Sequence, residues 1–405
     1  MITRRAVVSS GIAATLASTI GTGARAETTV GVTATEIKIG NTMPYSGPAS
    51  AYAVIGKGDA AFFKMVNDQG GVAGRKINFI SLDDSYSPPK TVEDVRRLVE
   101  EEKVAFLFNT LGTAPNSAIE RYCNQKKVPQ LFVSTGASKW ADPKKYPWTI
   151  GWQPSYRTEA QIYTKYMMKE KPNAKLAILY QNDDFGKDYL AGVRDVLGKD
   201  WDKVVVKAAS YETTDPTIDS QIVALQSSGA DALLVAATPK FAAQAIRKVH
   251  DLNWKPMFFL TNVSISVGAV MRPAGPENAV GIITTEYLKD PSDPVWNNDP
   301  GMKGFKDFMA KYMPGADISD SGYIFAYSAT YTMWHVLEQC KGDFSRENVM
   351  KQATTIQNLA VPTLLPGITV RTTPTDYRPI SAMQLARWDG KSWVLFGQVI
   401  EGVSA

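Results

Sequence analysis

The side chains that most often carry catalysis are scarce in this chain. Its 405 residues include only two histidines, His250 and His335. The chain therefore has almost none of the histidines that a histidine-based zinc site or a Ser-His-Asp triad requires. The run Gly56–Ala61 has the G-x-G-x-x-A spacing of a dinucleotide-binding turn, but it lies inside an expected helix. Asn182-Asp183-Asp184, with Asp188 after it, lacks the terminal glutamate of a calcium loop. We therefore expect no enzyme activity, no catalytic residue, no metal and no cofactor.

Polar turns follow the first two expected strands, and they suit binding. The first turn spans Met43 to Ser46, and the second spans Asp83 to Ser87. Between them, apolar residues at helical spacing end at Gly70-Gly71, where glycine adopts the positive φ that terminates a helix. A strand–helix–strand unit implies a parallel sheet with a right-handed crossover, and ligands bind outside the carboxyl ends of such strands. We therefore expect both turns to border a ligand site.

The alternation of strands and helices continues along the chain and restarts once. The aromatic, proline-containing segment 146–156 separates the two runs. Short apolar runs predict buried strands at 104–109, 128–134, 175–181, 204–208, 231–237 and 256–260. Because the alternation is interrupted at 146–156 and then restarts, two sheets joined by several chain crossings fit the sequence better than one long sheet. The sequence therefore predicts an α/β protein of two lobes with a cleft between them.

The first 26 residues indicate where the protein works. Paired arginines at Arg4 and Arg5 precede a weakly apolar core, and Ala24-Arg25-Ala26 provides a cleavage site. These features resemble a twin-arginine export signal, although an ordinary secretory signal with a charged start is the alternative. We expect residues 1–26 to be removed, so that the mature protein begins near Glu27 and acts in the periplasm. Because no cysteine follows the cleavage site, we do not expect a lipid anchor.

The composition and charge of the chain limit the kinds of molecule that it is expected to bind. The chain is 44% hydrophobic and 21% charged, with a formal net charge of +4, and removal of the signal would lower that charge. A balance this close to neutral does not favour nucleic acid as a partner. No segment after the signal has the roughly 20 uninterrupted apolar residues that a membrane span needs. The two cysteines, Cys123 and Cys340, either form a disulfide in an oxidising compartment or remain two buried free thiols.

An ordered set of segments resembles a known family over nearly the whole mature chain. The segments are IKIGNTMPYSGP, NDQGGVAGRKINFISLDD with the following SPPKTVEDVRRLV, VPQLFVS and AILYQNDDFGKDYLAGVRDVLG. In this order and spacing they look like the periplasmic solute-binding proteins of branched-chain amino acid ABC importers. The resemblance implies a type I periplasmic binding protein with two Rossmann-like lobes and three interlobe crossings. It places lobe 1 at residues 27–152 plus 286–372, and lobe 2 at 153–285 plus 373–405.

The resemblance also implies partners and a binding mode. The partners would be a small-molecule carboxylate and a membrane complex of permease and ATPase, with the binding protein a monomer. In this family the ligand carboxylate rests on lobe 1, on turns that match Leu111-Gly112-Thr113 and Ser134-Thr135-Gly136. Aromatic side chains and lobe 2 residues would complete the pocket. The predicted ligand-binding residues are Tyr45, Tyr52, Gly112, Thr113, Ser134, Thr135, Gly136, Trp152, Phe185, Thr238 and Thr261.

Each of these residues has a plainer interpretation. The hydroxyls of Thr113 and Ser134 could be ordinary helix caps, and the aromatic rings could be core or hinge packing. Their concentration at successive strand ends is what favours a site. A ligand sensor of the same fold, which signals to a receptor or regulator instead of feeding transport, is the alternative function.

The sequence departs from the family where an amino acid ligand would need a partner. Branched-chain amino acid binders pair the ligand ammonium with an acid on lobe 2, but Thr261-Asn262 follow the strand at 256–260. Without that acid a buried ammonium would be unpaired, at a cost of several kcal/mol. We therefore expect a carboxylate without the amine, either aromatic or short-chain, although Glu286 or Asp184 remains available as an acid.

Overall fold

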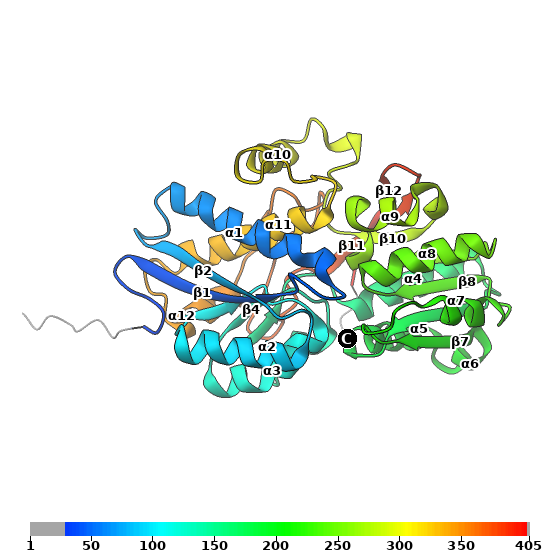
Figure 1. The fold of residues 1–405 in the computed structure, drawn as a ribbon, viewed down its shortest axis with the longest axis horizontal. Coiled ribbons are helices and arrows are strands. Elements are labelled where there is room, and N and C mark those ends of the chain that lie inside the picture. The colour runs from blue at the N-terminus through cyan, green and yellow to red at the C-terminus, as the bar shows by residue number, and fades with distance from the viewer. Residues whose placement is uncertain (1–28, 403–405) are drawn as a thin grey trace, which may run out of the picture.

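A computed structural model describes residues 29–402 and shows two α/β lobes side by side (Figure 1). The predicted signal, residues 1–26, lies outside the described residues. One lobe is built on a five-stranded sheet of order β2-β1-β3-β4-β5, and the other on a seven-stranded sheet of order β12-β11-β10-β9-β8-β6-β7. The two-lobed α/β fold predicted from the sequence is therefore confirmed. Among residues 29–402, no helix is both long and apolar enough to cross a membrane.

The five-stranded sheet is wholly parallel and carries helices on both faces (Figure 1). Helix α11 packs along α1, which also contacts α10, and α2 packs against α3. The strands are β1 (Glu36–Met43), β2 (Lys76–Asp83), β3 (Phe106–Phe108), β4 (Gln130–Val133) and β5 (Thr149–Gly151). The helices of this lobe are α1 (Ala53–Asp68), α2 (Pro88–Arg96), α3 (Thr113–Lys126), α10 (Pro300–Tyr312), α11 (Ser321–Gln339) and α12 (Arg346–Ala353).

The seven-stranded sheet is parallel from β7 to β10 and ends in an antiparallel hairpin of β11 and β12. Its strands are β6 (Leu176–Gln181), β7 (Val205–Tyr211), β8 (Ala232–Ala236), β9 (Met257–Leu260), β10 (Ile283–Glu286), β11 (Ala382–Trp388) and β12 (Trp393–Glu401). Its helices are α4 (Tyr156–Glu170), α5 (Asp184–Leu197), α6 (Trp201–Val204), α7 (Asp219–Gln226), α8 (Pro239–Asp251) and α9 (Arg272–Ala274). Because α10 to α12 return to the first lobe, the chain passes between the lobes three times.

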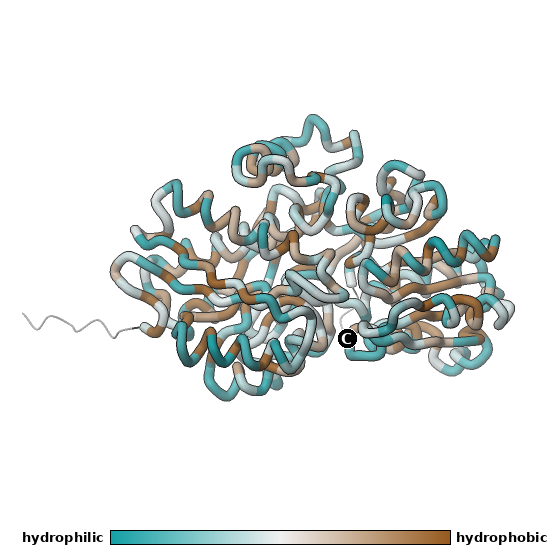
Figure 2. The backbone as a smooth tube through the Cα atoms, viewed as in Figure 1, coloured by the Kyte–Doolittle hydropathy of each residue, from teal (hydrophilic) through white to brown (hydrophobic). Residues whose placement is uncertain are grey.

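Apolar residues concentrate along the strands inside each lobe, while many residues of the outer helices are hydrophilic (Figure 2). Strand β6 illustrates the reason, since its side chains alternate between the two faces of the sheet. Leu176 and Ile178 belong to the core beneath α4 and α5, whereas Ala177 and Leu179 belong to the core beneath α7 and α8. Burial on both faces explains why such strands read as continuous apolar runs. Cys123 and Cys340 are both buried and free, so of the two alternatives the structure has the free thiols.

Among the buried acids of the two lobes, Asp59 and Glu159 receive hydrogen bonds from several elements. Asp59 on α1 is fully buried and accepts hydrogen bonds from the Asn109 side chain at 2.9 Å and the Thr330 hydroxyl at 2.7 Å. Glu159 on α4 accepts hydrogen bonds from the backbone N–H of Asn262 at 2.8 Å and the Thr285 hydroxyl at 3.1 Å. The hydroxyls of Tyr163 and Tyr189 also donate to the Glu159 carboxyl. Burial raises the pKa of Asp59 to about 8 and that of Glu159 to about 7.

These shifts predict that the protein loses stability as the pH rises. In the unfolded chain Asp59 would ionise near pH 4, so between about pH 5 and 7 the folded state holds a proton that the unfolded state has lost. The Asp59 contribution to the free energy of unfolding should then fall by about 1.4 kcal/mol per pH unit. Urea denaturation at pH 5, 6 and 7 should give a shallower decline for Asp59→Asn than for the wild type. Equal slopes for the two proteins, with Asp202→Asn at an exposed position as the control, would contradict this assignment.

Candidate ligand-binding site

A cleft between the lobes collects residues from the carboxyl ends of both parallel sheets. It holds about 1040 Å³ of space outside the protein atoms, part of it open to solvent. The lobe built on the five-stranded sheet contributes Tyr52 after β1, Tyr86 after β2, Gly112 and Thr113 after β3, Ser134 after β4 and Gln153 after β5. The other lobe contributes Phe185 after β6, Thr238 after β8, Asn262 after β9, and Glu286 and Tyr287 at the end of β10. Of the two strand-end turns expected to border a ligand site, the turn from Asp83 to Ser87 contributes Tyr86 to the lining, whereas no residue from Met43 to Ser46 lines the cleft.

The turn between β3 and α3 leaves donors free for an anion. Gly112 has φ +101°, and a Cβ there would lie 2.5 Å from the Tyr86 ring, so both backbone and space require glycine. Helix α3 begins at Thr113 without a side-chain cap, and the backbone N–H groups of Thr113 and Ala114 have no intrahelical acceptor, whereas Pro115 has no N–H and Asn116 donates to the Gly112 carbonyl at 3.1 Å. The Thr113 hydroxyl bonds that of Thr135 at 2.7 Å, which fixes the turn against the next strand end. This helix start therefore presents unpaired donors beside the cleft.

Two other helices that begin at the cleft, α5 and α11, are already capped by acids, whereas α4 and α8 begin there without a side-chain cap. The Asp183 carboxylate accepts from the backbone N–H groups of Phe185 and Gly186 at the start of α5. The Asp320 carboxylate does the same for Gly322 at the start of α11. A ligand carboxylate would be repelled at these two helix starts and attracted at α3, because the positive end of the α3 dipole is not neutralised.

Aromatic rings form much of the remaining wall. The Tyr156 and Phe185 rings meet edge to face with centroids 4.8 Å apart, and Phe325 lines the cleft beside Tyr287. Behind them the buried Trp152 packs edge to face on Phe325 at a centroid distance of 5.2 Å. The arrangement suits a ligand with a flat or apolar body.

The structure places six of the predicted site residues on the cleft surface. They are Tyr52, Gly112, Thr113, Ser134, Phe185 and Thr238. The other five, Tyr45, Thr135, Gly136, Trp152 and Thr261, do not line it. Whether the six bind ligand stays a prediction.

The five residues that do not line the cleft bond to or pack against other parts of the protein. The Tyr45 hydroxyl bonds Ser81 at 2.6 Å, and Gly136 lies beneath the Tyr156 ring. The Trp152 indole N–H donates to the Thr332 hydroxyl at 3.0 Å. Thr261 turns inward to bond the Tyr189 hydroxyl, and its neighbour Asn262 takes the cleft position instead. Thr135, as noted, bonds Thr113.

Several cleft residues escaped the sequence analysis. Tyr86 has φ +60°, held by a hydrogen bond from its backbone N–H to the Asp84 carboxylate at 2.9 Å. Its position inside the expected turn from Asp83 to Ser87 was the available signal. Gln153, Asn262 and Tyr287 also line the cleft, and each lies within two residues of a strand end.

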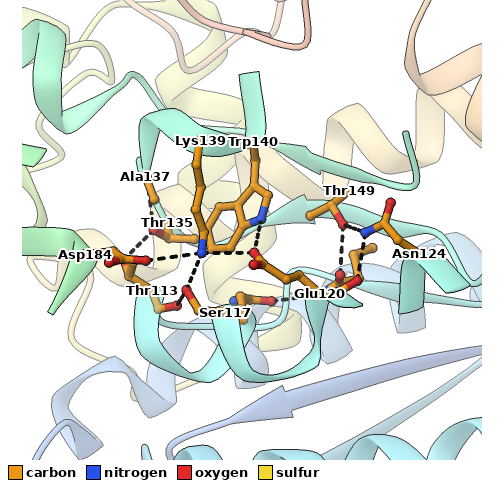
Figure 3. Close-up of polar contacts among 12 residues, drawn as sticks. Thr113, Ser117, Glu120, Asn124, Thr135, Ala137, Lys139, Trp140, Thr149 and Asp184 are labelled. Atoms are coloured by element: carbon orange, nitrogen blue, oxygen red, sulfur yellow. Dashed lines mark hydrogen bonds and ion pairs between the residues drawn. The ribbon is translucent and has the colours of Figure 1, made fainter. Parts of the chain in front are cut away.

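The two lobes touch across the cleft at both rims. At one rim Lys139 pairs with Glu120 of its own lobe at 3.0 Å and with Asp184 of the other lobe at 3.2 Å (Figure 3). Beside it, the Asp188 carboxylate accepts from the backbone N–H and the hydroxyl of Ser138 at 2.6 and 2.8 Å. Asp184, one of the two acids considered for a ligand amine, is therefore already paired and lies outside the cleft lining.

Further contacts lie at the opposite rim and inside the cleft. The Ser266 hydroxyl donates to Asp320 at 3.0 Å, and Arg272 pairs with Asp317. Inside, the Tyr52 hydroxyl donates to the Val263 carbonyl at 3.0 Å. The two lobes therefore contact each other at both rims and within the cleft.

A cleft between two hinged α/β lobes, lined by strand-end turns, defines a ligand-binding protein of the type I periplasmic binding fold. The chain belongs to the periplasmic binding protein family, whose profile matches residues 36–392. A curated relative, "Leu/Ile/Val-binding protein homolog 7" of Brucella suis biovar 1, is 22% identical over 290 residues, which are 68% of this chain and 70% of the relative.

Solved structures of similar fold hold different ligands. A branched-chain amino acid ABC transporter protein from Thermus thermophilus with bound valine has TM-score 0.81 at 15% identity, covering 91% of this chain and 97% of that one. An R. palustris solute-binding protein in complex with 4-hydroxybenzoate has TM-score 0.75 at 16% identity, covering 91% and 97%. At these identities the likeness concerns the fold alone.

The rim contacts predict how the open and closed forms are balanced. Asp188→Ala removes two hydrogen bonds to a carboxylate that join the lobes, which together should shift the equilibrium toward the open form by roughly tenfold. Small-angle X-ray scattering of the ligand-free protein should then report a larger radius of gyration. Asp195→Ala is the matched control, since Asp195 on the same helix pairs with Arg157 of its own lobe at 2.6 Å. An identical radius for Asp188→Ala and wild type would show that these contacts do not hold the lobes together.

Proposed function

We propose that this chain is the periplasmic solute-binding component of an ABC importer and that it captures a small organic carboxylate by closure of its lobes. The observation that carries the ligand class is the uncapped start of α3, flanked by the Thr113 and Ser134 hydroxyls in an otherwise aromatic cleft. Hydrogen bonds from such donors to a carboxylate are charge-assisted and therefore strong. The closed form would be the one presented to a permease and ATPase complex.

The chemistry of the walls supports an aromatic or short-chain acid. The rings of Tyr52, Tyr86, Tyr156 and Phe185 offer flat apolar surface, and most polar groups between them are already bonded within the protein. Proteins of similar fold have been solved with valine and with 4-hydroxybenzoate, so the fold admits both classes and the side chains must decide between them.

The lobe boundaries belong to the same proposal. Lobe 1 would comprise residues 27–152 plus 286–372, and lobe 2 residues 153–285 plus 373–405, with hinges near Trp152, Thr285 and Thr373. Strand β5 ends at Gly151, directly before Trp152, which supports a hinge there. Thr285 and Glu286 still pair with β11 of the seven-stranded sheet, so the second hinge would begin just after Glu286, which stays with lobe 2. The protein would act as a monomer after removal of residues 1–26.

Binding should depend on the hydroxyls and the aromatic ring of lobe 1. Purified residues 27–405 should melt at a higher temperature with an organic acid at 100 times its dissociation constant, which adds about 2.7 kcal/mol to stability. Ser134→Ala should weaken binding by about tenfold, the value of one hydrogen bond to a charged group, and Tyr52→Ala should weaken it further. Isothermal titration calorimetry measures both, with Ser220→Ala on exposed α7 as the hydroxyl-removal control. Unchanged affinity in both variants would remove this pocket assignment.

A further inference from the structure

Glu286 is an acid in the cleft for which the protein supplies no partner. It ends strand β10, opposite Gln384 of β11, and only 7% of the residue is exposed. Its side chain lines the cleft from the lobe of the seven-stranded sheet, while α3 belongs to the other lobe. Glu286 and the proposed carboxylate site therefore stand on different lobes, with the ligand space between them.

No hydrogen bond or ion pair within residues 29–402 involves the Glu286 carboxyl. Nearby acids, by contrast, accept several hydrogen bonds from the protein. Glu159 receives the four hydrogen bonds described above, and Asp290 accepts from the backbone N–H groups of Ser292 at 2.8 Å and Trp393 at 3.2 Å. The ammonium of Lys289 is taken up by Asp299 and the Pro362 carbonyl, each at 2.7 Å. Because the Glu286 side chain faces the cleft and has no protein partner, a group of the ligand could form the hydrogen bond that the protein does not supply.

The surroundings of Glu286 favour a neutral carboxyl group. Burial is the main cause that raises its pKa well above the usual range, and the nearby acids Asp290 and Glu159 raise it further. The other titratable groups at this wall are Tyr287, Tyr156, Asp320 and the paired Lys289. Because the ligand itself would bring a carboxylate, an ionised Glu286 would add a second uncompensated negative charge. A neutral carboxyl has one O–H donor and an acceptor oxygen, a combination that a hydroxyl group matches.

We propose that Glu286 selects the ligand by binding a hydroxyl group at the end remote from its carboxylate, so that the cleft takes hydroxylated organic acids in preference to plain ones. This inference rests on the proposed function, because it assumes that the carboxylate occupies the start of α3. In this proposal the acid that distinguishes one ligand from another lies at the end of β10. The residues after β9, Thr261 and Asn262, do not provide such an acid.

The test compares acids with and without a hydroxyl on the mature protein by isothermal titration calorimetry. The probes are 4-hydroxybenzoate and benzoate, 4-hydroxyphenylacetate and phenylacetate, and 3-hydroxybutyrate and butyrate, with valine added as an ammonium-bearing acid. We expect the wild type to bind the hydroxylated member of at least one pair tenfold or more tightly. Glu286→Leu should abolish that preference while leaving the affinity for the plain acid within about threefold.

Glu286→Gln separates selection from folding, because the amide keeps one donor and one acceptor in nearly the same shape. Glu286→Gln should retain most of the preference for the hydroxylated acid. If Glu286 had a merely structural role, Glu286→Gln and Glu286→Leu would lose the same affinity for the hydroxylated and the plain acid. Asp184→Asn, at the acid paired with Lys139 on the rim, should leave the preference unchanged.

The outcomes distinguish this inference from the function on which it rests. If acids bind without a preference for the hydroxyl, or if Glu286→Leu retains that preference, the role of Glu286 is wrong and the carboxylate site stands. Tighter binding of valine than of every hydroxylated acid, lost in Glu286→Gln, would make Glu286 the partner of an ammonium and overturn the proposal. If no acid binds, the proposed function itself fails and this inference fails with it.

Discussion

In each lobe a buried carboxyl group with several hydrogen bonds ties a cleft wall to the elements behind it: Asp59 in one lobe and Glu159 in the other. Asp59 holds Asn109, whose φ of +52° turns the chain out of β3 just before Gly112 and Thr113. In the other lobe Glu159 holds the backbone N–H of Asn262 and the hydroxyl of Thr285, which are a cleft residue and the neighbour of Glu286. A buried acid with hydrogen bonds from several elements fixes those elements relative to one another. The elements of each wall are thereby tied together, so under the proposed function ligand capture would come from movement between the walls.

The contacts between the lobes are of a different kind from those within them. Each lobe is held by large apolar clusters, whereas the rims meet through a few polar pairs such as Lys139 with Asp184 and Ser138 with Asp188. Partly exposed pairs contribute about 1 kcal/mol or less, far below the energy of a packed core. The closed form is therefore only weakly favoured by the protein itself. A ligand that touches both walls supplies the differential affinity that shifts the population.

The sequence predicted most parallel strands because they read as apolar runs, but it missed the parallel strand β10 and the strands β5, β11 and β12. The three-residue β5 is too short to show a pattern, and the β11–β12 hairpin lies beyond the alternation, although Asp389-Gly390 between two apolar runs is a hairpin signal. At the site, strand-end turns were predictable because topology fixes them. Side-chain direction was not, since a shift of one residue exchanges Thr261, which faces Tyr189, for Asn262, which faces the cleft.

Ligand selectivity in such a cleft depends on the polar groups whose hydrogen-bonding capacity the protein itself does not use. Most polar residues around this cleft are satisfied internally: Thr113 by Thr135, Tyr52 by Val263, and Asp320 by Ser266 and the start of α11. An acid after β9 is absent, and an unpaired acid stands instead at the end of β10. Moving the acid by one strand moves the point on the ligand that it can contact. Two members of one fold can thus hold a carboxylate in the same place and still distinguish what lies at its other end.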